Sequence, residues 1–455
     1  MIRLPRLALL LLASLAPAAE HHELADKVTT ALKDTGAPSV SVALVEHGQL
    51  AWAQAFGKAN IADNRAADTN TRYAVGSISK QFTVAAILLL QEQGKLSLDD
   101  KVAKYFPDLT DANEVTIREL LSHTSGYEDY APQDYMIPEW THATTPQVIL
   151  ERWAKKPLNF KPGAKWQYSN TNYVLAGEIF EKASGEGLLA FLREKIFEPL
   201  HMTSAGDCSV AGADDATAYT RYGLGPPRVA EREGPGWYFA AGELCMTASD
   251  LARWDIAFLR HQILSAASYE EFTREVKLPN GDRTHYALGL SIGELRNMPT
   301  ISHGGEVSGF LALNTVFPNR DGAVVMLSNE DDISLIGPLS DKIAVAAFLP
   351  EQSPVSETEI AQVRGILEGL QNGRVDHALF TDNANSYFTD AALQDFRSSL
   401  TPLGKLKTVT RLGESLRGGM IHRTYHADFT SKTVLLNIYV MPDGKYEQFL
   451  VEEQL

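Results

Sequence analysis

The sequence predicts an α/β protein of the α+β type. An antiparallel sheet is flanked by helices and carries a helical lobe, and a small C-terminal α+β domain follows. Strand-like segments occur early and again late before residue 350, with helical segments between them, so strands from both ends can close one sheet. The composition then turns polar around residues 352–359, and helices followed by strands return. We therefore expect one domain at residues 20–352 and a second at residues 356–455.

The segments of the first domain come in a clear order. Residues 21–36 have helical spacing, and residues 38–60 read as two strands joined by a turn at His47-Gly48. A helix that ends near Gly94 comes next. The late strand-like segments and a final helix are residues 286–295, 301–318, 322–329 and 338–349.

The C-terminal domain begins with helical spacing at residues 356–371 and 390–400. Its four strand-like segments are residues 405–415, 418–429, 432–441 and 445–454. The dipeptide Asp443-Gly444, between the last two, is a hairpin turn signal. Alternating apolar and polar residues in the second segment predict a strand with one buried face.

The N-terminus has the pattern of a secretory signal peptide, residues 1–19. Arg3 and Arg6 precede an apolar run, and Ala-Pro-Ala-Ala follows it. The alternative is a membrane anchor, but the apolar run at residues 7–15 is too short to span a bilayer. We expect a periplasmic or secreted protein with no integral membrane span after removal of this segment.

Composition limits the partners and cofactors. The formal net charge of −16 disfavours binding to nucleic acid or anionic membranes, although acidity also simply favours solubility. Cys208 and Cys245 could pair in an oxidising compartment, but their spacing leaves this open. No Cys/His cluster has metal-ligand spacing, so we expect no metal and no other cofactor.

Ser77 and Lys80 form the first chemical motif, in VGSISKQF. A serine hydroxyl needs a nearby base to act as a nucleophile. Residues three apart on a helix share one face, so the two side chains meet, and a dry site would lower the lysine pKa. The alternative is an ordinary helix start, with Ser77 as cap and an exposed lysine.

Two further motifs contain candidate site residues. Tyr168 and Asn170, two apart in KWQYSNTNY, point the same way in an extended segment. A tyrosine phenolate beside a lysine ammonium could serve as the base for Ser77, and the asparagine could bind a substrate amide and orient the lysine. The alternative is a loop tyrosine with a polar neighbour.

The third motif is SHGGEVSG, which contains His303, Gly304, Gly305 and Glu306. Two glycines weaken a strand and make sense where a backbone approaches a ligand. A backbone N–H here and that of Ser77 could form an oxyanion hole, and His303 could hold charge or donate a proton. The alternative is a bulge with an exposed histidine.

In this order and spacing, the motifs resemble those of the serine β-lactamase-like superfamily, which includes class C β-lactamases, DD-peptidases, D-aminopeptidases and family VIII esterases. The similarity covers roughly residues 25–350. It extends to the segments TIRELLSHTSGY, FKPGAKWQYSNTNYVLAGEIFEKASG and GELCMTASDLARW.

The resemblance implies a role for each candidate. Ser77 matches the acylated serine and Lys80 the lysine that activates it. Tyr168 matches the general base and leaving-group acid, and Asn170 the substrate-orienting amide. His303, Gly304 and Gly305 stand where many members carry Lys-Thr-Gly, and Glu306 stands where the backbone supplies the second oxyanion N–H.

The departures from Lys-Thr-Gly matter for the substrate. A neutral histidine attracts an anion less than an ammonium does, and Gly304 has no hydroxyl to donate. The Glu306 side chain could add negative charge. These changes weaken the case for efficient β-lactam hydrolysis, although histidine at this place also resembles some DD-peptidases and D-aminopeptidases.

Two other motifs are set aside. Residues 289–293 match the nucleophile-elbow pattern G-x-S-x-G, but no helix follows them, as that motif requires. His123 could be taken for a triad base, but the resemblance implies that its loop only supports the site.

Residues 356–455 look like cystatin-like or nuclear-transport-factor-like cone folds. A homodimer interface, substrate gating and passive spacing are the alternatives for them.

The leading hypothesis is an exported serine hydrolase that forms an acyl-enzyme on Ser77 and hydrolyses an ester or amide in a small molecule or peptide. Esterase or D-amino-acid peptidase activity ranks ahead of efficient β-lactamase activity. The alternatives are a penicillin-binding sensor or scaffold with little turnover, a true class C-like β-lactamase, and a chain whose C-terminal domain binds a small ligand.

Overall fold

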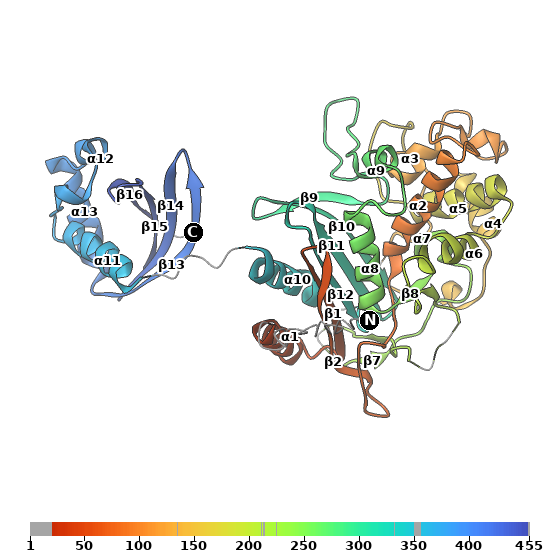
Figure 1. Cartoon of the computed structure of the whole chain (residues 1–455), viewed down its shortest axis with the longest axis horizontal. Helices are drawn as coiled ribbons and strands as arrows, with labels where there is room; N and C mark the ends of the chain where they lie inside the picture. The colour runs from red at the N-terminus through yellow and green to blue at the C-terminus, as the bar shows by residue number, and fades with distance from the viewer. Residues whose placement is uncertain are drawn as a thin grey trace, which may run out of the picture. The chain divides into compact units, whose positions relative to one another are not determined.

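The computed structural model describes most of the chain (Figure 1). The described residues are 21–453 except Asp134, Ala211, Ala213, Leu224, Asp332 and residues 350–355. The expected signal peptide at residues 1–19 lies outside them. The chain divides into two compact units between Phe348 and Leu349, and each is described by itself.

A seven-stranded antiparallel sheet forms the centre of the first unit, in the order β3-β2-β1-β12-β11-β10-β9. Its strands are β1 (Ser39–Glu46), β2 (Gln49–Asn60), β3 (Arg65–Ala66), β9 (Ser291–Leu295), β10 (Met298–Val307), β11 (Phe310–Phe317) and β12 (Gly322–Ser328). Because β1 pairs with both β2 and β12, early and late strands close one sheet, as predicted.

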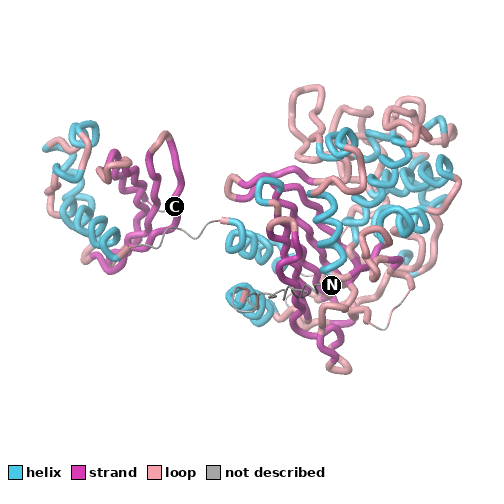
Figure 2. Tube along the Cα trace, viewed as in Figure 1, coloured by secondary structure: helices cyan, strands magenta, loops and turns pink. Residues whose placement is uncertain are grey.

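Helices cover both faces of this sheet (Figures 1 and 2). Helix α8 (Ala248–Leu259) packs on β1, β2, β11 and β12. On the opposite side in Figure 1, α1 (His22–Thr35) and α10 (Ile333–Phe348) pack against each other and against the sheet. β1 and β12 are therefore buried almost throughout, which fits the apolar run in β12 and the buried, small serines among the apolar residues of β1.

The inserted residues form a helical lobe. Its helices are α2 (Ser79–Glu92), α3 (Ile117–Leu121), α4 (Pro146–Ile149), α5 (Asn170–Ser184), α6 (Leu188–Leu192), α7 (Phe239–Gly242) and α9 (Ala266–Thr273). Small strands connect it: β4 (Tyr73–Ala74), β5 (Gly206–Asp207), β6 (Tyr219–Thr220), β7 (Arg228–Val229) and β8 (Leu244–Met246). Helix α2 contacts α5, α6, α7 and α9 and is buried all round, so it is the central helix of the lobe.

The second unit is a four-stranded antiparallel sheet with helices. Its elements are α11 (Glu357–Gln371), α12 (Asp382–Tyr387), α13 (Asp390–Leu400), β13 (Leu406–Arg417), β14 (Met420–Phe429), β15 (Thr433–Val440) and β16 (Tyr446–Glu453). The alternation in β14 buries Tyr425, Ala427 and Phe429 on one face, as expected. The predicted fold class is confirmed for both units.

Three local expectations differ from the structure. The strand expected from residue 286 begins at Ser291, and the helix expected from residue 338 begins at Ile333. Helix α12 was not predicted, because residues 382–387 carry few apolar side chains from which a period could be read.

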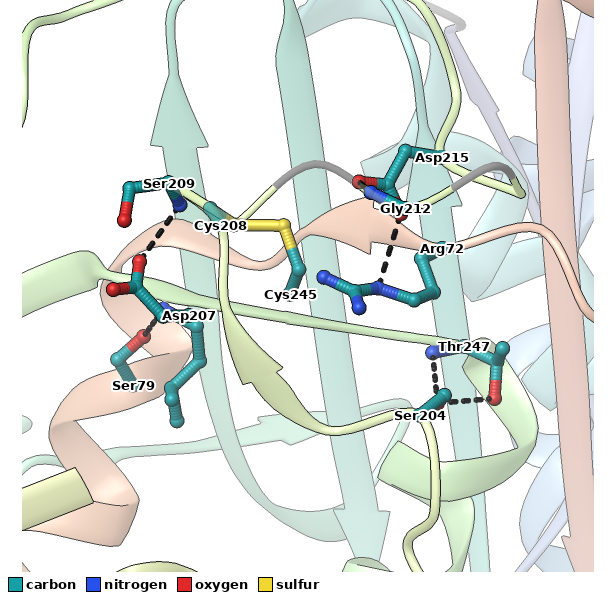
Figure 3. The surroundings of a disulfide bond; sticks show 11 residues. Arg72, Ser79, Ser204, Asp207, Cys208, Ser209, Gly212, Asp215, Cys245 and Thr247 are labelled. Atoms are coloured by element: carbon teal, nitrogen blue, oxygen red, sulfur yellow. Dashed lines mark hydrogen bonds and ion pairs between the residues drawn. A yellow bond between two sulfur atoms is a disulfide. The ribbon is translucent and has the colours of Figure 1, made fainter. Parts of the chain in front are cut away.

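Cys208 and Cys245 form a disulfide, which decides the question that their spacing left open (Figure 3). Cys245 lies on β8 and Cys208 directly follows β5, and these two strands pair. β8 also pairs with β4, which ends just before the Ser77 turn. The cross-link therefore holds the strand that supports the segment leading to Ser77.

Replacing both cysteines (Cys208→Ala, Cys245→Ala) should lower the free energy of unfolding of the first unit by about 2–4 kcal/mol, because the unfolded chain loses a cross-link. All six tryptophans precede Phe348, so fluorescence in a urea titration reports on this unit. A reductant should destabilise the wild type alone. Equal urea midpoints for oxidised wild type and the double variant would contradict the prediction.

Candidate active site

Ser77 lies in a single 3-10 turn, Gly76–Ile78, that leads into α2. The sequence placed it on the helix itself, but the turn keeps the same one-turn spacing to Lys80. The Val75 N–H donates to the Leu244 carbonyl at 2.9 Å, which fixes the approach to the turn. Ser77 is partly exposed, whereas Lys80 is fully buried. The hydroxyl can therefore meet a substrate while the amine stays out of water.

The Lys80 amine makes three hydrogen bonds. Nζ donates to Ser77 Oγ, Asn170 Oδ1 and the Ala241 carbonyl, each at 2.8 Å. Burial lowers the pKa of Lys80 to about 7, and the charge of Asp129 offsets part of this lowering. A sizeable fraction of Lys80 is consequently a neutral amine at neutral pH, held against the Ser77 hydroxyl.

Tyr168 approaches Ser77 from the loop that precedes α5. Its hydroxyl donates to Ser77 Oγ at 2.8 Å, and Lys80 Nζ lies 4.9 Å from the centre of its ring. Burial raises the pKa of Tyr168 far above its ordinary value, despite the hydrogen bond to Ser77. The side chain is therefore a phenol rather than the phenolate considered from the sequence.

Asn170 is the first residue of α5, and its carbonyl oxygen faces Lys80. Its backbone N–H donates to Asp129 Oδ1 at 2.9 Å, and its side-chain Nδ2 donates to Asp129 Oδ2 at 3.4 Å. Sequence reasoning missed Asp129. Its place two residues after LLSHTSGY, the loop thought to support the site, was the available signal.

Strand β10 crosses directly against the Ser77 turn. A Cβ on Gly305 would lie 1.9 Å from the Val75 carbonyl oxygen, and one on Gly76 would lie 2.8 Å from the Glu306 nitrogen. Gly76 also has φ +49°, which favours glycine. The backbones of Ser77 and Glu306 therefore lie side by side. The sequence predicted that the glycines of SHGGEVSG allow the backbone to approach a ligand. At Gly305 the group that approaches is the protein's own backbone, at Val75.

Gly304 and the side chain of Glu306 lie on the exposed face of β10, although the Glu306 backbone takes part in that contact. The nearest heavy atom to a Cβ on Gly304 would be the Ala312 carbonyl oxygen at 3.9 Å. The Gly304 position therefore borders open space rather than packed protein.

His303 is buried and has partners at both ring nitrogens. Nδ1 lies against the Gly304 carbonyl, which can only accept, so Nε2 accepts from the Tyr286 hydroxyl at 2.7 Å. Burial, followed by the charge of Lys80, lowers the pKa of His303 to about 4. The expectation that His303 holds charge or donates a proton is therefore corrected: the ring is neutral and engaged. Sequence reasoning missed Tyr286.

His123 supports the site from behind Tyr168, whereas Ser291 lies on an edge strand outside it. The His123 ring centre lies 4.2 Å from that of Tyr168, and its Nδ1 accepts from the Ser169 N–H at 3.2 Å. His123 is fully buried, so it packs behind Tyr168. Ser291 begins the edge strand β9 and is not part of a nucleophile elbow.

Two absences hold for the described part of the chain. It contains no group of three or more His, Cys, Asp or Glu side chains placed to bind a metal ion. None of its helices combines the length and the apolar character needed to cross a bilayer.

The sheet, the lobe and the residues gathered at Ser77 define a β-lactamase/transpeptidase-like fold with its site between the two parts. The Beta-lactamase family model matches residues 24–335. The chain therefore belongs to the Beta-lactamase family, whose members have a hydrolase fold of this type. The resemblance stated from the sequence is confirmed.

Three known proteins illustrate this relationship. "Penicillin-binding protein 4*" of Bacillus subtilis is 29% identical over 326 residues, which cover 64% of this chain and 68% of that protein. A D-stereospecific amidohydrolase from Streptomyces sp. has a TM-score of 0.62 at 26% identity and covers 73% of this chain and 99% of its own. The octameric penicillin-binding protein homologue from Pyrococcus abyssi has a TM-score of 0.64 at 20% identity and covers 94% and 99%.

Gly305→Ala should reduce kcat/KM for a simple ester by about 100-fold or more, because the new Cβ forces β10 away from Ser77. Gly304→Ala, one residue earlier on the same strand, should cost at most about threefold, because its Cβ meets only ordinary contacts. Similar losses in the two variants, measured by steady-state kinetics, would contradict this account of the glycine.

Proposed function

We propose that this protein is a serine hydrolase that attacks an ester or amide carbonyl with Ser77 and forms an acyl-enzyme, which water then cleaves. One observation carries the proposal. The Lys80 amine and the Tyr168 hydroxyl each lie 2.8 Å from Ser77 Oγ. Distances of this size allow proton transfer to and from a nucleophilic oxygen.

The directions of the pKa shifts favour Lys80 as the general base and Tyr168 as the general acid. Neutral Lys80 takes the Ser77 proton as Oγ bonds to the carbonyl carbon. Tyr168 gives its proton to the leaving group as that bond breaks, and Lys80 returns a proton to Tyr168. The backbone N–H groups of Ser77 and Glu306 would stabilise the developing oxyanion, and the contact between Gly76 and Glu306 supports this role.

The substrate we propose is an ester or a D-amino-acid amide or peptide rather than a β-lactam. Neutral His303 and the hydrogen at Gly304 offer no strong attraction for a carboxylate, and Glu306 lies exposed on the same strand. The D-stereospecific amidohydrolase from Streptomyces sp. is a relative consistent with this choice. Acylation with little turnover, as in a penicillin-binding protein, is the second candidate, and the likeness to penicillin-binding protein 4* favours it.

We also propose that the chain is exported to the periplasm or secreted. The N-terminal pattern of two arginines, an apolar run and small residues supports export, and the Cys208–Cys245 disulfide fits an oxidising compartment. A homodimer through the C-terminal unit stays a prediction. The octameric state belongs to the Pyrococcus abyssi homologue.

A nitrophenyl ester should give a burst of nitrophenol equal to one acyl group per chain, followed by slower turnover. Ser77→Ala should lose both phases, because no oxygen remains to be acylated. Intact-mass measurement should show one acyl group per chain, and peptide mapping should place it on Ser77. An unchanged rate in Ser77→Ala would reject the proposal. A labelled Ser77 without turnover on any ester or D-amino-acid amide would instead favour the penicillin-binding alternative.

The rate of acylation should rise with pH through about 7 and level off above pH 8, because Lys80 acts as a base only without its proton. Stopped-flow measurement of the burst with a neutral ester, from pH 5 to 9, tests this. His303→Asn is the control and should leave the midpoint in place. If the midpoint shifts in His303→Asn, the pH dependence reports the titration of His303 rather than that of Lys80, and the prediction is wrong.

A further inference from the structure

Asp129 is a buried carboxylate that the reaction above leaves without a role. It is 8% exposed and is hydrogen-bonded to Asn170, which contacts Lys80. Its Oδ1 accepts from the backbone N–H groups of Asn170 at 2.9 Å and Ala131 at 3.1 Å, and its Oδ2 accepts from Asn170 Nδ2 at 3.4 Å. A carboxylate in such a place costs free energy unless its contacts offset the loss of water.

These contacts determine which end of the Asn170 amide faces Lys80. Because Nδ2 donates to Asp129, the carbonyl Oδ1 is turned toward Lys80 Nζ, which donates to it at 2.8 Å. A reversed amide would place its NH2 group against the lysine amine and its carbonyl oxygen against the Asp129 carboxylate, which has no proton to donate. A hydrogen-bonded chain thus runs from Asp129 through Asn170 and Lys80 to Ser77 Oγ.

Asp129 also supplies the negative charge near the amine. The titratable side chains that face Lys80, from β10, α5 and the loops before α5, are Asp129, Tyr168, Tyr173, His123 and His303. Burial raises the pKa of both tyrosines, so they keep their protons. Burial, followed by the charge of Lys80, lowers the pKa of both histidines, which favours the neutral form of each ring. Burial raises the pKa of Asp129, but its hydrogen bonds and the charge of Lys80 oppose that rise. Within this set, Asp129 is therefore the group that can be an anion.

We propose that Asp129 is a positioning residue that orients the Asn170 amide and, through its charge, sets the pH range in which Lys80 can activate Ser77. The proposal rests on the serine-hydrolase function but adds a determinant that lies outside the reacting groups. A purely structural Asp129, one that only shapes the loop through Ala131, would change stability and rate without changing the pH dependence.

Labelling by a fluorophosphonate tests the charge effect without depending on the natural substrate. Ser77 Oγ forms a bond to phosphorus, fluoride leaves, and Lys80 takes the proton, so the rate reports the state of Lys80. The rate is followed by intact mass from pH 5 to 9 for the wild type, Asp129→Asn and Glu178→Gln. Glu178 is the matched control, because it is a carboxylate on α5 that is also 8% exposed but is bound by Gln147.

Asp129→Asn removes the charge and turns an NH2 group toward Asn170. The plateau rate should fall about tenfold, the rough cost of losing one positioning hydrogen bond at this site. The midpoint should move down by about half to one pH unit, so the ratio of the rate at pH 6 to that at pH 8 rises about three- to fivefold. Glu178→Gln should keep the wild-type ratio.

An Asp129→Asn protein that melts normally and keeps the wild-type ratio, or that is not labelled at any pH, would overturn the inference. If this variant does not fold, Asp129→Glu decides. It keeps the charge in a different place, so it should lower the plateau and leave the midpoint unmoved, and a downward shift would overturn the inference. Absence of labelling in the wild type would instead reject the serine-hydrolase function.

Discussion

The burial of one lysine amine is the constraint on which the rest of the site depends. Lowering the pKa of Lys80 from 10.5 to about 7 means that its surroundings disfavour the ammonium by about 5 kcal/mol. Three hydrogen-bond acceptors keep the amine in place, and they come from the Ser77 turn, α5 and α7. The lobe packs around α2, so the amine stays dry while the hydroxyl that it contacts touches solvent.

A second constraint joins the lobe to the sheet. Strand β10 lies so close to the Ser77 turn that Gly305 and Gly76 have no room for a side chain on the facing side. Behind the turn, β8 pairs with β4 and is cross-linked through Cys245 to Cys208. The nucleophile is thus held from both sides by backbone, which leaves little freedom in the position of Oγ.

The polarity of the site is decided by burial rather than by residue type. A histidine on the surface could carry charge near neutral pH, but His303 is enclosed beside Lys80 and accepts from Tyr286, so it is neutral. Tyr168 keeps its proton for the same reason. This corner of the site therefore offers a substrate hydrogen bonds and shape rather than a positive charge.

The sequence alone determined the features that depend on short-range periodicity. It indicated the strand pairs at both ends of the first unit, the helix that carries Lys80 and the hairpin turns. The segments with the candidates Ser77, Tyr168 and His303 were indicated by their motifs and by the family resemblance, not by a period. Helical and strand periods are local, so they can be read from one segment at a time. Only the tertiary structure decided that the two cysteines pair, that Asp129 and Tyr286 belong to the site, and that His303 is neutral. Pairing, desolvation and charge depend on which distant segments meet, and no local pattern records that.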